Sequence, residues 1–296
     1  MNIILSKTTS KDTINEVVSY MDNELSPLWY RLSKHRFTTR PPSYADVLIR
    51  WGCSASVDTE SEVVYNKNIK QIKDKGVVRK LLDENDIPVP EPVDLTKVDP
   101  YEDLPLVVRP ATHQKGGDFL LFNNISDVLD KGYLISRLDN PYGSRLYPKT
   151  HEYRVHIGHG KVLLVQEKVQ TSFEHVGENW NYENGYSFVV IPWKQYRKEI
   201  VSLAVEALEV VGLDFGAVDI MSDPLDHFLP IAVVCEINTS PRLEGYTAQR
   251  YAEYFDWLIR TKETRHFEIP PDLSARHYVF KHRELRDGDY DLDFKE

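Results

Sequence analysis

The first quarter of the chain contains two short apolar runs separated by a helical pattern. Residues 1–5 are rich in apolar side chains and predict a strand, and a second predicted strand at 47–51 stops at Gly52. Between them, apolar residues recur every three or four positions, at Ile14, Val17, Val18 and Met21. Residues 1–65 are therefore predicted to form a small α/β lobe.

The second quarter combines a helical stretch with a pair of strands. Apolar spacing at 69–82 predicts helices that end before Pro88, because proline cannot continue a helix. Residues 106–109 and 119–122 predict two strands of a hairpin-like unit, joined by a loop that contains the Gly116–Gly117 pair.

The second half of the chain is dominated by hairpins. Alternating residues on either side of the sequence GHGK predict a β-hairpin at 151–170. The remaining predicted elements are a strand at 186–191, a helix at 198–211, two antiparallel strands at 213–221 and 231–238, and an amphipathic helix at 247–262. This order favours an α+β fold over a doubly wound sheet. The charged tail after Pro270 is expected to be poorly ordered or docked on a partner.

Composition and net charge limit the classes of protein to which this chain can belong. Of the 296 residues, 41% are hydrophobic and 28% are charged, which suits one large core or two to three small lobes. The net charge of -10 argues against a protein whose main task is gripping nucleic-acid phosphates, since that affinity comes from Lys and Arg. A local basic cleft remains compatible with an acidic chain.

The two cysteines and the apolar segments bear on the compartment. Cys53 and Cys235 are far apart and form neither a zinc motif nor a disulfide framework. Cys235 lies in an apolar strand and is predicted to be a small buried hydrophobic residue. The first apolar run is too short for a signal peptide, and no stretch approaches the ~20 apolar residues of a membrane helix. We therefore expect a cytoplasmic protein.

Oxygen-bearing side chains lie at the ends of two predicted neighbouring strands. Asp219 ends one strand, and Glu236 and Asn238 follow the apolar run at 231–234. Residues i and i+2 of a strand share a face, so the acid and the amide point the same way. Because Mg²⁺ prefers oxygen ligands, the triplet predicts a metal site. The alternative is that these residues are solvated polar groups at strand ends.

Cations from several segments could face a phosphate. Arg109 ends a predicted strand, and backbone N–H groups of the glycine loop behind it could approach phosphate closely. Further positive charge comes from Lys75, Arg154 and Lys168. Taken singly, each cation is more often a surface residue, and a glycine pair is more often part of a plain turn.

Five ordered motifs between about residues 66 and 260 resemble those of the ATP-grasp enzymes. DKGVVRKLLDENDIPVP (74–90) resembles their opening signature, and LPLVVRPATHQKGGDFLL (104–121) resembles the strand–glycine loop–strand unit that closes over the triphosphate. HEYRVHIGHGKVLLVQEK (151–168) resembles the hairpin that carries an arginine. LEVVGLDFGAVDIM (208–221) and VCEINTSPRLEG (234–245) resemble the two metal-binding strands. The pattern is most similar to the glutamate ligases that modify ribosomal proteins and, more distantly, to the D-alanine–D-alanine ligases.

The resemblance implies an α+β ATP-grasp fold. The small N-terminal lobe would span residues 1–65, and two α+β lobes clasping ATP would make up an ATP-grasp domain at 66–262. Within that domain a lid lobe would occupy about residues 104–140, and residues 263–296 would form a C-terminal tail.

The resemblance also implies roles for the candidate residues. The ATP phosphates would be contacted or covered by Lys75, Arg109, His113, Lys115, Gly116, Gly117 and Lys168. The hinge against adenine would be the segment 133–138, including Tyr133 and Ile135. Arg154 would stabilise the transferred phosphate, and Asn184 and Gly185 would lie near the acyl phosphate. Mg²⁺, with Mn²⁺ as an alternative, would be held by Asp219, Glu236 and Asn238.

Two positions and one segment depart from the pattern of the family. Arg109 stands where many members have lysine, which keeps the charge but changes its geometry. Arg242 stands where a glycine usually follows the proline, so it could clamp a substrate carboxylate or pair with Glu244. The segment 133–139 lacks the acidic residue expected to read the adenine amino group.

The activity implied is an ATP-dependent ligation of a carboxylate to an amine through an acyl phosphate, with release of ADP and phosphate. The acceptor would be an amino acid or a peptide rather than a nucleic acid. The N-terminal lobe, including Trp51 and Gly52, and the tail beyond residue 262 are expected to shape the acceptor site. The alternatives are a phosphotransferase or non-ligating nucleotide-binding protein of the same fold, and a structural or interaction protein. Neither the acid nor the oligomeric state is predicted.

Overall fold

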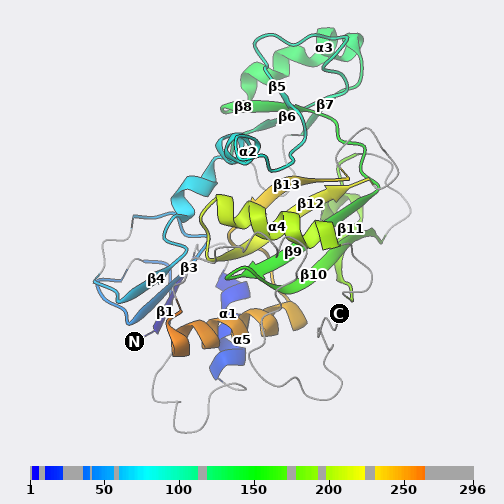
Figure 1. Ribbon diagram of the computed structural model, residues 1–296. Coiled ribbons are helices and arrows are strands. Elements are labelled where there is room, and N and C mark those ends of the chain that lie inside the picture. Colours follow the sequence, from blue (N-terminus) through cyan, green and yellow to red (C-terminus); the bar gives the residue numbers. More distant parts are fainter. Residues whose placement is uncertain are drawn as a thin grey trace.

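The structure is a computed structural model that describes residues 2–6, 11–22, 36–40, 42–56, 60–112, 119–171, 178–192, 198–223 and 231–263. Within these residues the strands form an N-terminal sheet, a lid sheet and a large sheet (Figure 1). The predicted behaviour of the tail after Pro270 lies outside the described residues. No helix in the described ranges has the length and apolar character needed to cross a membrane.

The N-terminal sheet has the order β2-β1-β3-β4, and its strands run parallel. Its elements are β1 (Asn2–Ser6), α1 (Lys11–Tyr20), β2 (Arg36–Thr38), β3 (Val47–Trp51) and β4 (Val63–Tyr65). All five residues of β3 are buried, as expected for a parallel strand covered on both faces. The predicted strands at the start of the chain and before Gly52 are therefore confirmed.

The lid sheet is antiparallel, with the order β5-β8-β6-β7. Its elements are β5 (Pro92–Val93), β6 (Leu106–Pro110), β7 (Leu120–Phe122), α3 (Ile125–Lys131), η4 (Gly132–Arg137) and β8 (Pro141–Arg145). The predicted pairing of β6 with β7 is confirmed. A small core lies beneath the sheet, formed by Val93, Leu106, Val108 and Phe122. This unit forms the upper part of the molecule in Figure 1.

The large sheet has the order β11-β10-β9-β12-β13 and is antiparallel throughout. Its strands are β9 (His151–Gly158), β10 (Lys161–Gln170), β11 (Tyr186–Val190), β12 (Phe215–Ser222) and β13 (Ala232–Asn238). The hairpin of β9 and β10 turns through His159 and Gly160, whose φ angles are 49° and 70°. Two positive φ angles suit the tight turn of a twisted hairpin. The sequence prediction of this hairpin and of the β12–β13 pair is confirmed.

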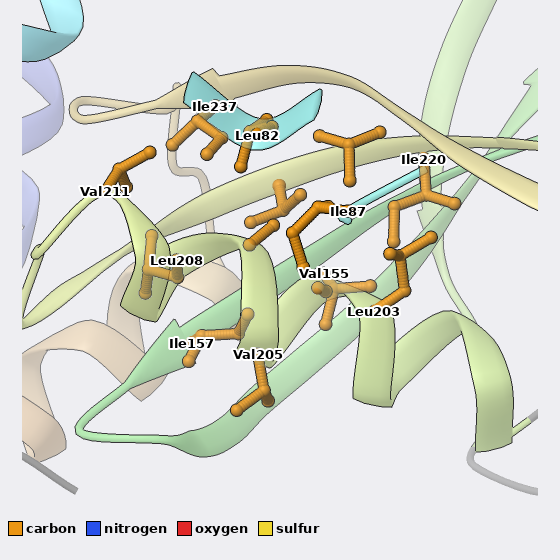
Figure 2. Close-up of a cluster of buried hydrophobic side chains, with 14 of the residues drawn as sticks. Leu82, Ile87, Val155, Ile157, Leu203, Val205, Leu208, Val211, Ile220 and Ile237 are labelled. Atoms are coloured by element: carbon orange, nitrogen blue, oxygen red, sulfur yellow. The ribbon is translucent and has the colours of Figure 1, made fainter. Parts of the chain in front are cut away.

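One face of the large sheet packs on helices in the middle of the molecule. These are α4 (Lys198–Val210) and, after the 3₁₀ turn η3 (Ile69–Lys73), α2 (Lys75–Asp83). Figure 2 shows Leu208 of α4 and Leu82 of α2 in one cluster with Val155 of β9 and Ile237 of β13. Because strand residues alternate between faces, this burial directs Arg154 and His156 to the opposite face.

The opposite face is covered at one end by α5 (Tyr246–Thr261) and left open at the other. Helix α5 buries Tyr251 and Phe255 against Phe215 of β12 and Trp51 of β3. Trp51, which was expected to help shape the acceptor site, has no exposed surface and therefore cannot contact an acceptor directly. This bulky apolar side chain fills the junction between the N-terminal sheet and α5.

Candidate active site

A cavity of ≈ 840 Å³ lies at the open end of the large sheet. The lid sheet contributes Val107 and Arg109, the segment between β8 and β9 contributes Leu146 and Tyr147, and strands of the large sheet form the floor. A cavity of this size and position is the part of the described structure best suited to a ligand.

Four polar side chains cross the floor in one row, each on a different strand. Gln166 of β10 pairs with Arg154 of β9, Arg154 with Asp219 of β12, and Asp219 with Glu236 of β13. All four line the cavity. Cross-strand neighbours lie about 5 Å apart, so antiparallel pairing brings together residues that are up to 82 positions apart in sequence.

Arg154 and Asp219 form a buried, two-pronged ion pair in the centre of this row. Arg154 Nε and Nη2 donate to Asp219 Oδ1 and Oδ2 at 2.7 and 2.8 Å. Burial would raise the pKa of Asp219, but the charge and hydrogen bonds of Arg154 hold it below its ordinary value. The guanidinium carbon also lies 4.1 Å from the centre of the Phe188 ring. The pairing and the ring fix the orientation of the arginine.

The three predicted metal ligands lie together at the β12–β13 end of the row. Glu236 pairs with Lys75 Nζ, and Asn238 Nδ2 donates to Asp219 Oδ2 at 3.1 Å. The strand β13 runs through Asn238, so the acid and the amide belong to the strand itself rather than following its end. Among the described residues there is no cluster of three or more His, Cys, Asp or Glu side chains that could hold a metal. The donor set is two carboxylates and one amide oxygen, which fits a hard cation that also binds phosphate oxygens.

A second charged cluster borders the row. Glu152 is 4% exposed and binds two lysines, Lys149 at 2.7 Å and Lys168. Lys149 lies 4.6 Å from the centre of the Trp180 ring, which stacks on Tyr186. The cluster is built of two cations and one anion, so it leaves a net positive charge beside the cavity.

The lid side of the cavity carries arginines held by aromatic rings. Arg109 lies over Phe119 at 5.1 Å, and Arg79 of α2 lies over Tyr142 at 5.0 Å. Arg79 also donates to Ser144 Oγ at 3.0 Å. Arg109 thus lies on the lid side, and Arg79, which also donates to Cys235 O at 3.2 Å, lies where α2 meets the lid sheet and β13.

Several predicted residues lie at or outside the edge of the cavity. Lys75 reaches the site through Glu236 but does not line the main cavity. Asn184 Nδ2 donates to Asn179 O at 2.7 Å, and Gly185, with φ 78°, caps the 3₁₀ turn η5 (Tyr182–Asn184). These two residues therefore shape the loop, while Asn181 and Tyr186 line the cavity.

The predicted adenine hinge does not face the cavity. Tyr133 and Ile135 lie in the 3₁₀ helix η4, where Tyr133 is 58% exposed under Arg137 and Ile135 packs on the core of the lid sheet. Neither residue lines the cavity. His113, Lys115, Gly116 and Gly117 lie outside the described residues.

Two further residues of the cavity wall differ from expectation. Cys235 is partly exposed to the cavity, because a β-bulge after Asp219 shifts the register of β12 against β13. It is therefore not the fully buried residue that the apolar run predicted. Arg242 is 79% exposed at the rim and pairs with Glu244 at 2.5 Å, the second of the two roles left open by the sequence.

Sequence reasoning missed residues that carry no motif of their own. Ser144, Leu146 and Tyr147 line the cavity where the chain passes from the lid sheet to the large sheet. Glu152 and Gln166 line the floor. A usable signal was present for these last two, because each lies two positions from a predicted site residue on the same strand and must share its face.

Comparisons with known proteins address the fold. The sequence matches no protein-family model and no curated protein. Among solved structures, it is similar to the ATP-grasp ligase PsnB complexed with minimal precursor, with 12% identity and a TM-score of 0.60 over 89% of this chain and 99% of that one. It is also similar to D-alanine–D-alanine ligase from Bacillus anthracis, with 13% identity and a TM-score of 0.58 over 87% and 92% of the two chains.

A third similar structure is the D-cycloserine synthetase DcsG, with 11% identity and a TM-score of 0.61 over 88% of this chain and all of that one. At these identities the likeness establishes the fold, which agrees with the order of motifs and with the mixed sheets seen here. The chain therefore has the ATP-grasp fold of these ligases.

Proposed function

We propose that this protein is an ATP-dependent ligase that joins a carboxylate to an amine through an acyl phosphate. The observation that carries the proposal is the row Arg154–Asp219–Glu236 on the cavity floor, opposite Arg109 on the lid sheet. A carboxylate must be activated before an amine can attack it, and phosphorylation requires groups that hold two anions in line and neutralise their charge.

The nucleotide would lie between the lid sheet and the large sheet. Arg109 faces the cavity from the roof, where it can contact phosphate oxygens as a planar fork. Leu146, Tyr147 and Met221 line an apolar part of the cavity that suits the adenine base. We assign the hinge to the segment 144–147, in place of 133–138.

The fit of a metal rests on the donor set described above. Asp219, Glu236 and Asn238 would hold Mg²⁺, and when bound the ion would neutralise phosphate charge during transfer. Lys75 and Arg154 balance the two carboxylates of this set, so neither acid faces the cavity as an uncompensated charge.

The protein's own groups would position and stabilise the reacting phosphate. Arg154 is preorganised by Asp219 and Phe188, so it can stabilise charge on the transferred phosphate without first being ordered. Lys149 and Lys168, which share Glu152, add positive charge on the same floor. Closure of the lid sheet would exclude water, which would otherwise hydrolyse the acyl phosphate.

The direct test is ADP release. Purified protein with Mg-ATP is screened against amino acids, dipeptides and small carboxylates, and the products are identified by mass spectrometry. Release of ADP that depends on an acid and an amine, with a condensed product, supports the proposal. ATP binding with no dependence of ADP release on any acid contradicts it.

A second readout tests the intermediate. Hydroxylamine added with Mg-ATP and the active acid should trap the acyl phosphate as a hydroxamate. Full ADP release without hydroxamate would instead indicate phosphate transfer by another path.

A further inference from the structure

Beneath Gln166, at the β10 end of the floor row, a buried chain of hydrogen bonds leads into the core. Gln166 Oε1 lies 2.9 Å from His156 Nε2, and His156 Nδ1 lies 3.1 Å from the hydroxyl of Tyr251. His156 and Tyr251 have no exposed surface. Gln166 therefore rests on two side chains that ligands in the cavity do not reach.

The chemistry of this chain sets the direction of each hydrogen bond. A glutamine oxygen can only accept, so His156 Nε2 carries a hydrogen, and Nδ1 of the neutral ring is an acceptor beside the Tyr251 hydroxyl, which also lies 3.3 Å from Gly216 O. Burial lowers the pKa of His156 to about 3, so the ring is neutral, and burial raises the pKa of Tyr251, so its hydroxyl keeps its proton. The side-chain oxygen of Gln166 is thus hydrogen-bonded to the buried His156.

The amide nitrogen of Gln166 is the group left for the cavity side. It lies 3.5 Å from Thr247 Oγ1, a long contact, at the first turn of α5. Both Gln166 and Thr247 line the cavity, and Thr247 is 4% exposed. Together they offer N–H and O–H donors at one point of the wall.

The surroundings of this point carry a net positive charge. Gln166 lies beside Arg154 across the strands and two positions from Lys168 along β10. The neighbouring charges are the cations Arg154, Lys168 and Lys149 and the anions Asp219 and Glu152. A group of donors beside this cluster is suited to an oxygen anion.

Position in the row separates this point from the nucleotide. Glu236 and Asp219 stand at the proposed metal end, Arg154 follows, and Gln166 is one strand, or about 5 Å, further on. We propose that Gln166, with Thr247, binds a carboxylate oxygen of the acid substrate, and that His156 and Tyr251 act as positioning residues for its amide. This inference rests on the proposed function, because it assigns part of the same cavity to the acid.

The test measures binding, so it does not depend on turnover. Amino acids and dipeptides are titrated calorimetrically into the protein with Mg-AMPPNP, and the tightest carboxylate ligand is then titrated into Gln166→Glu and Gln166→Leu. Loss of a hydrogen bond to a charged group predicts a rise in Kd on the order of 10-fold or more in both variants. The Kd for AMPPNP should stay within about twofold in both.

The matched control is Gln170→Glu, the same change on the same strand at an exposed position that does not line the cavity. It should leave both dissociation constants unchanged. A Gln166 variant that binds the carboxylate as tightly as the wild type overturns the inference, as does a wild type that binds no member of the panel. A ligand that binds through Gln166 but never stimulates ADP release would leave the inference standing and contradict the proposed function.

The positioning role has its own control within α5. Tyr251 and Tyr254 are both fully buried, and each hydroxyl contacts a histidine, Tyr251 at His156 and Tyr254 at His159. Tyr251→Phe should raise the Kd for the carboxylate ligand by roughly threefold or more, whereas Tyr254→Phe should only lower the melting temperature. Equal ligand affinity in the two variants would show that Tyr251 has a structural role only.

Discussion

Arg154 and Asp219 are cross-strand neighbours whose side chains meet through two parallel hydrogen bonds, at 2.7 and 2.8 Å, on the floor of the cavity. Asp219 is thus both a proposed metal ligand and the group that orients the proposed phosphate clamp. The two proposed roles depend on one ion pair, so a substitution at either residue is expected to affect the interactions of the site with both the nucleotide and the metal.

The first prediction concerns Arg154→Lys. A lysine keeps the charge but cannot bind both oxygens of Asp219, so the clamp loses its orientation. We expect the maximal rate of ADP release to fall on the order of 10²-fold, with a smaller change in ATP affinity. Arg260→Lys, a partly exposed partner of Asp256 on α5, serves as the control and should retain full activity. An unchanged maximal rate with weaker ATP binding would mean that Arg154 binds only the ground state.

The second prediction concerns Glu236→Gln. The change removes a proposed metal ligand and the partner of Lys75, while the side-chain volume stays almost the same. ADP release should fall by on the order of 10²-fold or more, and the circular dichroism spectrum should remain that of the wild type. Glu84→Gln, which loses an exposed helical pair with Lys80, should behave as the wild type. Full activity in folded Glu236→Gln protein would contradict the metal assignment.

The third prediction concerns the close packing of α5 on the large sheet. A Cβ added at Gly158 would lie 2.5 Å from the Tyr254 ring, which is buried and has no room to move. Gly158→Ala should therefore destabilise the fold by about 1–3 kcal/mol in chemical denaturation. At Gly132 the nearest atom to an added Cβ is 3.9 Å away and the backbone is helical, so Gly132→Ala should be neutral or stabilising. Equal effects of the two variants would contradict this packing.

The fourth prediction concerns acid stability. The pKa of His156 falls from 6.5 to about 3 on burial, so below pH 6.5 the unfolded chain binds a proton that the folded protein does not. Above pH 6.5 the protonation of His156 does not affect the free energy of unfolding. As the pH falls from 6.5 towards 3, the free energy of unfolding decreases progressively. At pH 5 the loss is about 2 kcal/mol.

The measurement is the free energy of unfolding of wild type and His156→Gln between pH 7 and 4. The variant should show a shallower decrease with falling pH, whatever its stability at pH 7. Parallel pH profiles would show that His156 does not become protonated on unfolding in this range.

The sequence by itself determined the elements whose pattern is local. The β9–β10 hairpin, the β12–β13 pair and α5 follow from alternation and helical spacing, which depend only on neighbours in the chain. The shared face of Glu236 and Asn238 follows from the same rule, and both line the cavity. The motifs likewise indicated the fold that the comparisons establish.

Only the tertiary structure decided which side chains meet. It also decided which segments without a local sequence signature form strands. Strand β8, with the sequence PYGSR, contains proline and glycine and is held by its neighbours in the lid sheet rather than by its own propensity. The sequence alone does not distinguish Trp51 from an exposed aromatic residue, because its burial depends on packing against α5. Gln166 and Glu236 lie 70 residues apart in sequence and on strands that are not adjacent, and they share a row because the antiparallel registers of the strands between them place them there. Periodicity reports the face of a strand, but the register between strands is a property of the folded chain.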